Sequence, residues 1–241
     1  MKSAFRCFVA EFLGTVFLLA AVVGSGIMGE KLAAGNVAIA LLANSVATGA
    51  ALVALILAFG PVSGAHFNPA VTLADATQRG IPWARVPGYF VAQCAGAMVG
   101  VYVAHLMFAQ PMIQTSHHAR TGTAQLFSEF VASFGLLAAI WGCSRSRAAV
   151  VPFAVGAYIT AAYWFTASTS FANPAVTLAR SFTDTFAGIR RSDAPAFIAM
   201  QFVGALAATA VFRWLLPGIP RTAEQVLVPH EDSSSKASFR H

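Results

Sequence analysis

Charged residues are scarce in this chain: Lys, Arg, Asp and Glu make up 10% of its 241 residues, whereas 57% are hydrophobic. An ordinary soluble domain carries about 25% charged residues. The shortage of charge therefore argues against a soluble protein. The mean hydropathy of +0.68 indicates instead a chain that lies in a lipid bilayer.

Clusters of catalytic or metal-binding side chains are also missing. No group of His, Glu and Asp falls within the apolar segments, so neither a nucleophile with its base nor a metal site is available there. His117 and His118 are adjacent but lack a third ligand at a recognisable spacing. The three cysteines form no C-x-x-C pair and are expected to be packed thiols. We therefore expect no enzymatic activity, no catalytic residues, and no metal or cofactor.

Long apolar blocks are present in place of these sites. A helix needs about 20 mostly apolar residues to cross the hydrocarbon core of a membrane. Six blocks come close to or exceed that length, and they cover residues 7–27, 36–58, 82–108, 124–142, 148–166 and 194–216. The predicted class is an all-α membrane protein with six transmembrane helices and the lipid bilayer as its partner.

The basic residues indicate how these spans are oriented. Six spans put both termini on one side, and with that side cytoplasmic, ten basic residues face inward and five outward. The positive-inside rule favours this orientation, which explains the net charge of +6 without nucleic acid as a partner. The outward set is Lys31, Arg120, Arg180, Arg190 and Arg191. Short loops and the absence of a targeting segment suit a bacterial inner membrane.

An internal repeat organises the chain. The seven residues 68–74, with the sequence Asn-Pro-Ala-Val-Thr-Leu-Ala, recur identically at 173–179. Each copy lies between the second and third span of its half, and a half with an odd number of spans must enter the membrane from the opposite side to the other half. The repeats, about 5–108 and 124–217, are therefore inverted in topology. Small residues at Gly96 and Gly204, each followed four residues later by another small residue, favour close helix packing.

The repeated motifs predict two half-helices. Asn is a good N-cap and Pro suits the first helical turn. Residues 68–77 and 173–186 are helix-compatible, but at about 1.5 Å per residue they reach only about half of a 30 Å core. The segments before them are irregular, and irregular backbone at membrane depth must be buried in protein or line a wet cavity. We therefore expect a water-filled pore with a half-helix entering from each side.

The motif residues themselves suit a pore for neutral solutes. These residues are Asn68, Pro69, Ala70, Asn173, Pro174 and Ala175. Half-helices that begin near the midplane direct their positive dipole ends at each other, which opposes cations. The two asparagine amides can hold a solute oxygen from two sides. A small, uncharged, hydroxylated solute is the expected cargo.

At this point a resemblance is plain. Residues 63–72, with the sequence Ser-Gly-Ala-His-Phe-Asn-Pro-Ala-Val-Thr, are similar to the first pore loop of the aquaporin and aquaglyceroporin (major intrinsic protein) family, and the resemblance covers residues 5–217. It implies a homotetramer with a pore in each protomer, buried structural glutamates at Glu11 and Glu129, and a pore-lining histidine at His66. The polar tail, residues 218–241, is expected to be disordered.

The resemblance also implies a selectivity filter, placed by its offsets from each Asn. Its members would be Thr48, Ala161, Ser170 and Val176. Most relatives have arginine where Val176 stands, so this filter is expected to be small-sided, uncharged and permissive for solutes larger than water. We expect Arg180 to be no substitute, because on a helix it would lie more than one turn away and face elsewhere.

The sequence also bears on which solutes are transported and on whether the transport is passive. The stretch 173–182 resembles bacterial members of the family associated with arsenic resistance, which implies undissociated arsenite beside water and glycerol-like polyols. The alternative is a secondary active transporter, since inverted repeats and broken helices also occur there. Coupling usually needs intramembrane ionisable groups, and only Glu11 and Glu129 stand out.

Overall fold

The computed structural model describes residues 4–216, apart from the side chains of residues 145 and 146. Within that part of the chain every regular element is a helix. Six helices are long and apolar enough to cross a membrane. They are α1 (Ala4–Leu32), α2 (Val37–Ser63), α4 (Val86–Met107) with the short η1 (Trp83–Arg85) before it, α5 (Thr123–Arg147), α6 (Val151–Phe165) with the short η2 (Ala148–Val150) before it, and α8 (Ala194–Leu215). The predicted fold class is confirmed.

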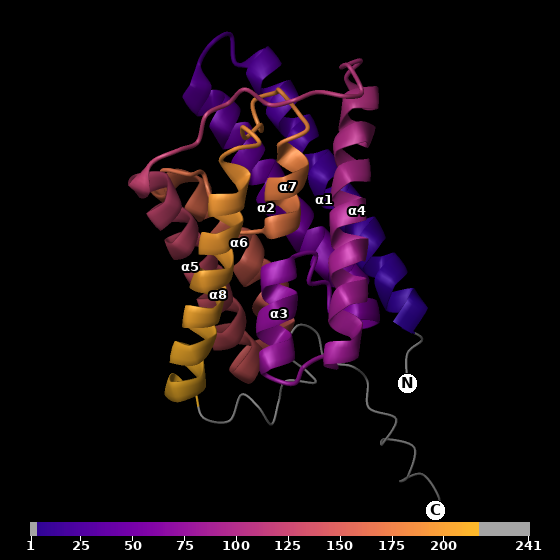
Figure 1. Cartoon of the computed structure of the whole chain (residues 1–241), viewed down its shortest axis with the longest axis vertical. Coiled ribbons are helices and arrows are strands. Elements are labelled where there is room, and N and C mark those ends of the chain that lie inside the picture. Colours follow the sequence, from indigo (N-terminus) through magenta and orange to yellow (C-terminus); the bar gives the residue numbers. More distant parts are fainter. Residues whose placement is uncertain (1–3, 217–241) are drawn as a thin grey trace, which may run out of the picture.

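The two half-helices are α3 (Pro69–Thr77) and α7 (Pro174–Arg180). They lie one above the other in the middle of the bundle, while the start of α1 and the end of α8 lie at the same end of the molecule (Figure 1). Helix α7 ends at Arg180, earlier than the predicted residue 186. It stops because the backbone N–H groups of Ser181 and Phe182 bond three residues back, and Ile189 then bonds to the Arg180 carbonyl as the chain turns round. The tail predicted to be disordered lies outside the described residues.

Helix packing mixes the two repeats. Within the first repeat α1 packs on α2 and α4, and within the second α5 packs on α6 and α8. Across the repeats α2 packs on α6, while α7 contacts α4 and α3 contacts α8. Each half-helix is therefore held against a span of the other repeat, which places the motif region at the centre of the fold.

Glycines set the closest helix crossings. A Cβ atom at Gly96 on α4 would collide with the carbonyl oxygen of Phe12 on α1. A Cβ atom at Gly204 on α8 would collide in the same way with the carbonyl oxygen of Phe130 on α5. Because backbone cannot yield as a side chain can, glycine is needed at both crossings.

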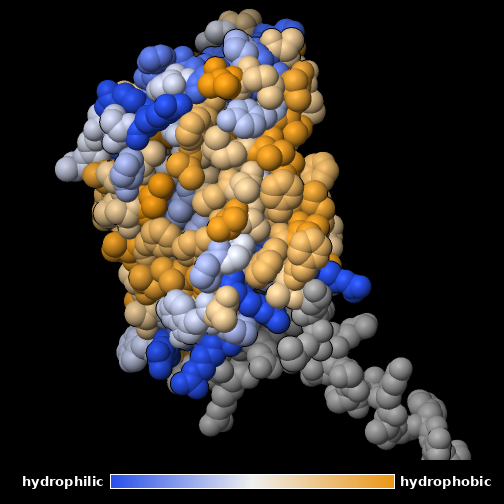
Figure 2. Space-filling view, turned by 45° about the vertical axis from the view of Figure 1, so that its right-hand side comes forward, coloured by the Kyte–Doolittle hydropathy of each residue, from blue (hydrophilic) through white to orange (hydrophobic). Residues whose placement is uncertain are grey.

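The outer surface matches a bilayer. The face in Figure 2 carries an apolar belt across its middle and hydrophilic residues at both ends. Large side chains such as Phe17, Val91 and Val203 are more than half exposed on the spans. Apolar groups in this arrangement are stable in lipid and not in water. The chain is an integral membrane protein.

Candidate functional site

The two asparagines of the repeated motif meet at the centre of the bundle. Asn68 Oδ1 accepts from the backbone N–H of Ala70 (2.9 Å) and caps α3, while its Nδ2 donates to the Ala172 carbonyl (2.8 Å). Asn173 caps α7 through Ala175 N (3.0 Å) and donates from Nδ2 to the Phe67 carbonyl (2.8 Å). An amide NH₂ has two hydrogens, so each asparagine keeps one donor for the cavity that both line.

The loops before the motifs are strained. Five alanine, phenylalanine, threonine or serine residues have left-handed backbone, namely Ala65, Phe67, Thr169, Ser170 and Ala172, with φ between 47° and 60°. Such residues cost about 1 kcal/mol or more each and persist only where surrounding bonds fix them. The loops must therefore be anchored from outside themselves.

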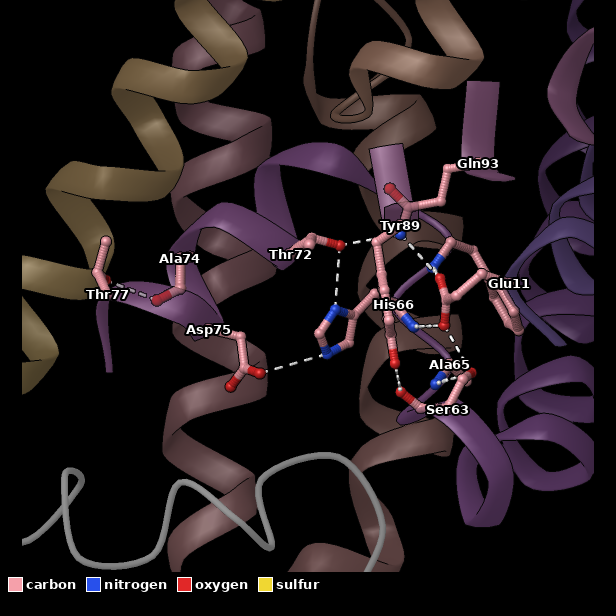
Figure 3. A network of polar contacts seen from close by, with 11 residues as sticks. Glu11, Ser63, Ala65, His66, Thr72, Ala74, Asp75, Thr77, Tyr89 and Gln93 are labelled. Atoms are coloured by element: carbon pink, nitrogen blue, oxygen red, sulfur yellow. Dashed lines mark hydrogen bonds and ion pairs between the residues drawn. The ribbon is translucent and has the colours of Figure 1, made fainter. Parts of the chain in front are cut away.

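Glu11 anchors the first loop, as the resemblance implies. Its carboxylate is fully buried and accepts four hydrogen bonds, from Ser63 Oγ (2.6 Å), His66 N (3.0 Å), Phe67 N (2.7 Å) and Gln93 Nε2 (2.8 Å). Figure 3 shows this network gathered around the loop. Four donors compensate the burial of the charge, so the Glu11 carboxylate has a structural role in holding the first loop.

Glu129 anchors the second loop in the same manner. It accepts from the backbone N–H groups of Phe171 and Ala172 (both 2.9 Å) and from Gln201 Nε2 (2.5 Å). Gln201 also donates to Thr177 Oγ1 (2.7 Å), as Gln93 does to Thr72 Oγ1 (2.9 Å). Gln93 and Gln201 were not predicted as site residues, although each is followed three residues later by Gly-Ala in its repeat.

The cavity between the half-helices has an apolar wall and a polar one. Side chains of α1, α2, α5 and α6 form the apolar wall, namely Leu18, Val22, Leu52, Ile56, Leu136, Ile140, Val155 and Ile159. Polar groups come mainly from the loops and half-helix ends, and they include Thr48, His66, Asn68, Tyr163, Ser170, Asn173 and Arg180. Such a lining suits a solute with both C–H and O–H surface.

Three of the four expected filter residues lie at this cavity. Thr48, Ser170 and Val176 line it, but Ala161 does not and is exposed on the outer face of α6. Tyr163 lines the cavity instead, with its hydroxyl 3.2 Å from Thr48 Oγ1. Residues two apart on a helix point about 200° apart, so a two-residue error in the offset moves the position from the cavity to the lipid face. On this side the cavity is therefore lined by an aromatic side chain and not by alanine.

Arg180 also lines the cavity, so the expectation that it faces elsewhere is wrong. Residues four apart on a helix share a face, and Arg180 therefore extends along the side of α7 that carries Val176. The side chain is 2% exposed, its Nε donates to the Ala187 carbonyl, and its guanidinium carbon lies 3.4 Å from the ring centre of Phe171. The α7 end of the cavity is therefore charged.

At the α3 end, His66 forms a different polar group. Its Nδ1 lies 3.0 Å from Thr72 Oγ1, and its Nε2 lies 3.5 Å from Asp75 Oδ2 (Figure 3). Asp75 was not singled out from the sequence. The available signal was that Asp75 and Arg180 are the first residues at which the two copies differ after their shared motif.

The loop that joins the repeats braces the α7 end. Arg120 donates from Nε to the Gly188 carbonyl (2.9 Å) and from Nη1 to the Ser168 carbonyl (3.2 Å), and it lies 5.0 Å from the Phe171 ring. Its backbone N–H bonds to Asp193. Burial alone would raise the pKa of that carboxyl, but hydrogen bonds from Arg190 and Arg120 outweigh it and hold the pKa below its usual value.

The loop that joins the repeats also contains His117 and His118. The backbone N–H of His117 donates to Asp184 (2.8 Å), which fastens the loop to the segment after α7. Across residues 4–216, no three His, Cys, Asp or Glu side chains are grouped closely enough to hold a metal ion. His105 is fully buried, with Nε2 2.8 Å from Thr183 Oγ1. These contacts are structural.

Known proteins share this arrangement. The chain matches the family Major intrinsic protein over residues 1–170 and 144–240. It is 56% identical over 211 residues to aquaglyceroporin AqpS of Rhizobium meliloti (strain 1021), covering 88% of this chain and 90% of that protein. It is 36% identical over 210 residues to aquaporin NIP1-4 of Oryza sativa subsp. japonica, covering 83% and 72%.

A solved structure agrees with these matches. The X-ray structure of the aquaglyceroporin from Plasmodium falciparum superposes with a TM-score of 0.68 at 25% identity, over 90% of this chain and 99% of that one. The overall fold of this chain thus recurs in a solved aquaglyceroporin. The chain belongs to the major intrinsic protein family, and it is a passive channel for small uncharged solutes.

Proposed function

We propose that this channel passes glycerol-like polyols and undissociated arsenite as well as water. The observation that carries the proposal is the cavity at the meeting point of α3 and α7, with aliphatic side chains along one wall and asparagine, threonine and tyrosine donors beside it. Glycerol has C–H and O–H faces that fit such walls. Arsenious acid is a neutral trihydroxy species of comparable shape.

The motif residues Asn68 and Asn173 would hold the solute at the midpoint. Each has one amide hydrogen committed to the opposite loop and one left for a solute oxygen. The positive ends of both half-helix dipoles point at the same place, so a neutral acceptor is favoured there over a cation. Water would be oriented by the same two donors.

The constriction at the α7 end would set the size limit. We assign it to Thr48, Tyr163, Ser170 and Val176, of which Val176 leaves more room than a long basic side chain would. The hydroxyls of Thr48 and Tyr163 bond to each other, and each can also serve a passing hydroxyl group. A polyol would therefore exchange one set of hydrogen bonds for another as it passes.

The assembly and orientation follow the same proposal. We place both termini in the cytoplasm of a bacterial inner membrane and expect a homotetramer. Two observations support the orientation: Arg120 lies behind the cavity wall and Arg180 is buried beside the cavity. Neither is a free charge in an outer loop, so the inward excess of basic loop residues is larger than the sequence count suggests. Crosslinking in native membranes would test the tetramer.

Stopped-flow light scattering on proteoliposomes tests the transport. We expect glycerol and arsenite to enter faster than into protein-free liposomes, with the solute reaching equal concentration on both sides. Asn173→Asp, which puts a carboxylate at the midpoint, should reduce both fluxes. Water flux without glycerol or arsenite flux would refute the proposed solute class.

Active transport predicts a different result from the same vesicles. A secondary transporter would accumulate solute against its gradient, and an uncoupler would abolish the accumulation. The carboxylates of Glu11 and Glu129 are occupied by four and three hydrogen bonds, which speaks against their carrying protons. Uncoupler-sensitive accumulation would nevertheless replace the channel proposal.

A further inference from the structure

The charge at Arg180 is held in place by its surroundings. Nε donates to Ala187, and the guanidinium is stacked on Phe171. The Phe171 ring is itself fixed, because its backbone N–H bonds to Glu129 and its ring packs edge-on against Phe197 with the centres 5.5 Å apart. Arg180 also stands in the last turn of α7, where the negative end of the helix dipole favours a cation.

In the described part of the chain no carboxylate forms an ion pair with the same guanidinium, although Glu129 attracts it from farther away. Within the described residues, Arg190 pairs with Asp193 and His66 contacts Asp75, and Arg180 takes part in neither contact. Its Nη1 and Nη2 atoms donate to no acceptor in that part of the chain. A buried cation without a partner is costly. Because Arg180 lines the cavity, water or a solute in that cavity can accept hydrogen bonds from the terminal nitrogens.

A second cation reinforces the first. The guanidinium carbon of Arg120 lies 5.0 Å from the Phe171 ring centre, compared with 3.4 Å for that of Arg180, so both arginines contact one ring. Arg120 donates to the Ser168 and Gly188 carbonyls and forms no ion pair among the described residues. The α7 end of the cavity is therefore positive on account of two arginines.

We infer that Arg180 determines the charge selectivity of the channel, from one helical turn beyond Val176. It repels cations and offers Nη–H donors to an oxygen of the passing solute, and this explains how a constriction with valine at position 176 can remain selective. The favoured solutes are neutral molecules rich in oxygen acceptors. This inference rests on the proposed channel function and names the residue that sets its solute class.

The experiment compares Arg180→Met with the native protein in the same vesicles. Met keeps the apolar contact with Phe171 and removes the charge. Methylammonium, a cation small enough to share a path with glycerol, is the probe, and glycerol flux is measured in parallel. We expect methylammonium flux to rise by roughly tenfold or more, since a unit charge at contact distance in a partly dehydrated pore is worth at least that factor. Arg180→Lys, which keeps the charge, should keep methylammonium flux as low as in the native protein.

Three further variants keep the test decisive. Arg191→Leu removes an exposed arginine that stacks on Phe182 outside the cavity, and it should change neither flux. If size-exclusion chromatography shows that Arg180→Met does not fold, Val176→Glu neutralises Arg180 from one turn away, with Val176→Gln as its uncharged control. Val176→Glu should then be the leakier of the two to methylammonium.

The outcomes separate the two claims. Native protein without glycerol flux removes the proposed function. Native glycerol flux together with an unchanged methylammonium flux in Arg180→Met, or in Val176→Glu relative to Val176→Gln, overturns the role of Arg180 and leaves the channel proposal standing.

Discussion

The half-helices α3 and α7 begin with the same seven residues, counted from the capping asparagine, and differ at the eighth. Up to that point they are nearly equivalent. The capping asparagine of each half-helix donates to a carbonyl of the other loop, and each loop is anchored by a buried glutamate that accepts from a glutamine. The eighth residue is Asp75 in α3 and Arg180 in α7. Asp75 contacts His66, whereas Arg180 lines the cavity. Duplication thus supplied the scaffold, and divergence after the motif supplied opposite charges at its two ends.

Removing the glutamate that anchors either loop should have the largest effect on stability. Glu11→Ala leaves four donors unsatisfied and Glu129→Ala leaves three, so each variant should lose about 3–5 kcal/mol of folding free energy, with Glu11→Ala the worse. Thermal unfolding in detergent, followed by size-exclusion chromatography, measures the loss. Glu30→Ala, at an exposed position, is the control. Equal stability of all three would mean that the loops are held by something else.

Adding a methyl group at the helix crossings should have the next largest effect. Gly96→Ala and Gly204→Ala each drive a Cβ into a backbone carbonyl, and overpacking of this kind costs about 1–3 kcal/mol. The two losses should match, because the crossings are copies of each other. Gly142→Ala meets only a ring carbon of Phe212 at 3.5 Å and should be tolerated. A large difference between the first two variants would contradict the equivalence of the repeats.

Placing arginine at Val176 should narrow the α7 end. The new guanidinium would lie one turn from Arg180, so the constriction would gain both bulk and like charge. We expect glycerol and arsenite fluxes to fall about tenfold, equivalent to about 1.4 kcal/mol, in the stopped-flow assay. Val176→Leu controls for bulk alone and should retain more flux. Unchanged flux in Val176→Arg would place the limiting constriction elsewhere.

Neutralising the charge at the α3 end should have the smallest effect. Asp75→Asn replaces a buried carboxylate whose Oδ2 lies 3.5 Å from His66 Nε2 and whose Oδ1 has no hydrogen-bond partner. The loss of that contact and the removal of a buried charge should nearly cancel in the free energy of unfolding, and methylammonium should stay excluded. The thermal and flux assays above both apply. A cation leak as large as that of Arg180→Met would show that the two ends share the task of charge selection.

The spans, the half-helix starts and the inverted topology could be predicted because they depend on local sequence patterns. Apolar length gives a span, and Asn followed by Pro marks a helix start, so α3 was predicted to within a residue. The inverted topology followed from an identical motif after an odd number of spans. Glu11 and Glu129 required the family resemblance, because their partners are backbone and side-chain groups far away in the sequence, which no spacing reveals.

The asymmetric features were harder to predict because they depend on where the chain turns. Ala161 was chosen by an offset that assumes a fixed loop length, and the shift to Tyr163 came from the short segment between the end of α6 and Asn173. The end of α7 at Arg180 is set by hydrogen bonds to residues that return from beyond it. For Arg180 the information was available, since a spacing of four residues already places it on the face of Val176.

The reciprocal bonds of the two asparagines have a consequence for synthesis. Asn68 donates to a carbonyl 104 residues later in the chain, and Asn173 donates to one 106 residues earlier. At about 5–20 residues per second, the first motif is made roughly 5–20 s before its partner exists. Partway through that interval α4 is completed and gives the first repeat its third span, yet the re-entrant loop still lacks the Ala172 carbonyl. The first repeat therefore cannot complete its pore loop alone, and the hydrogen bonds between the two loops form only after the second repeat has been inserted.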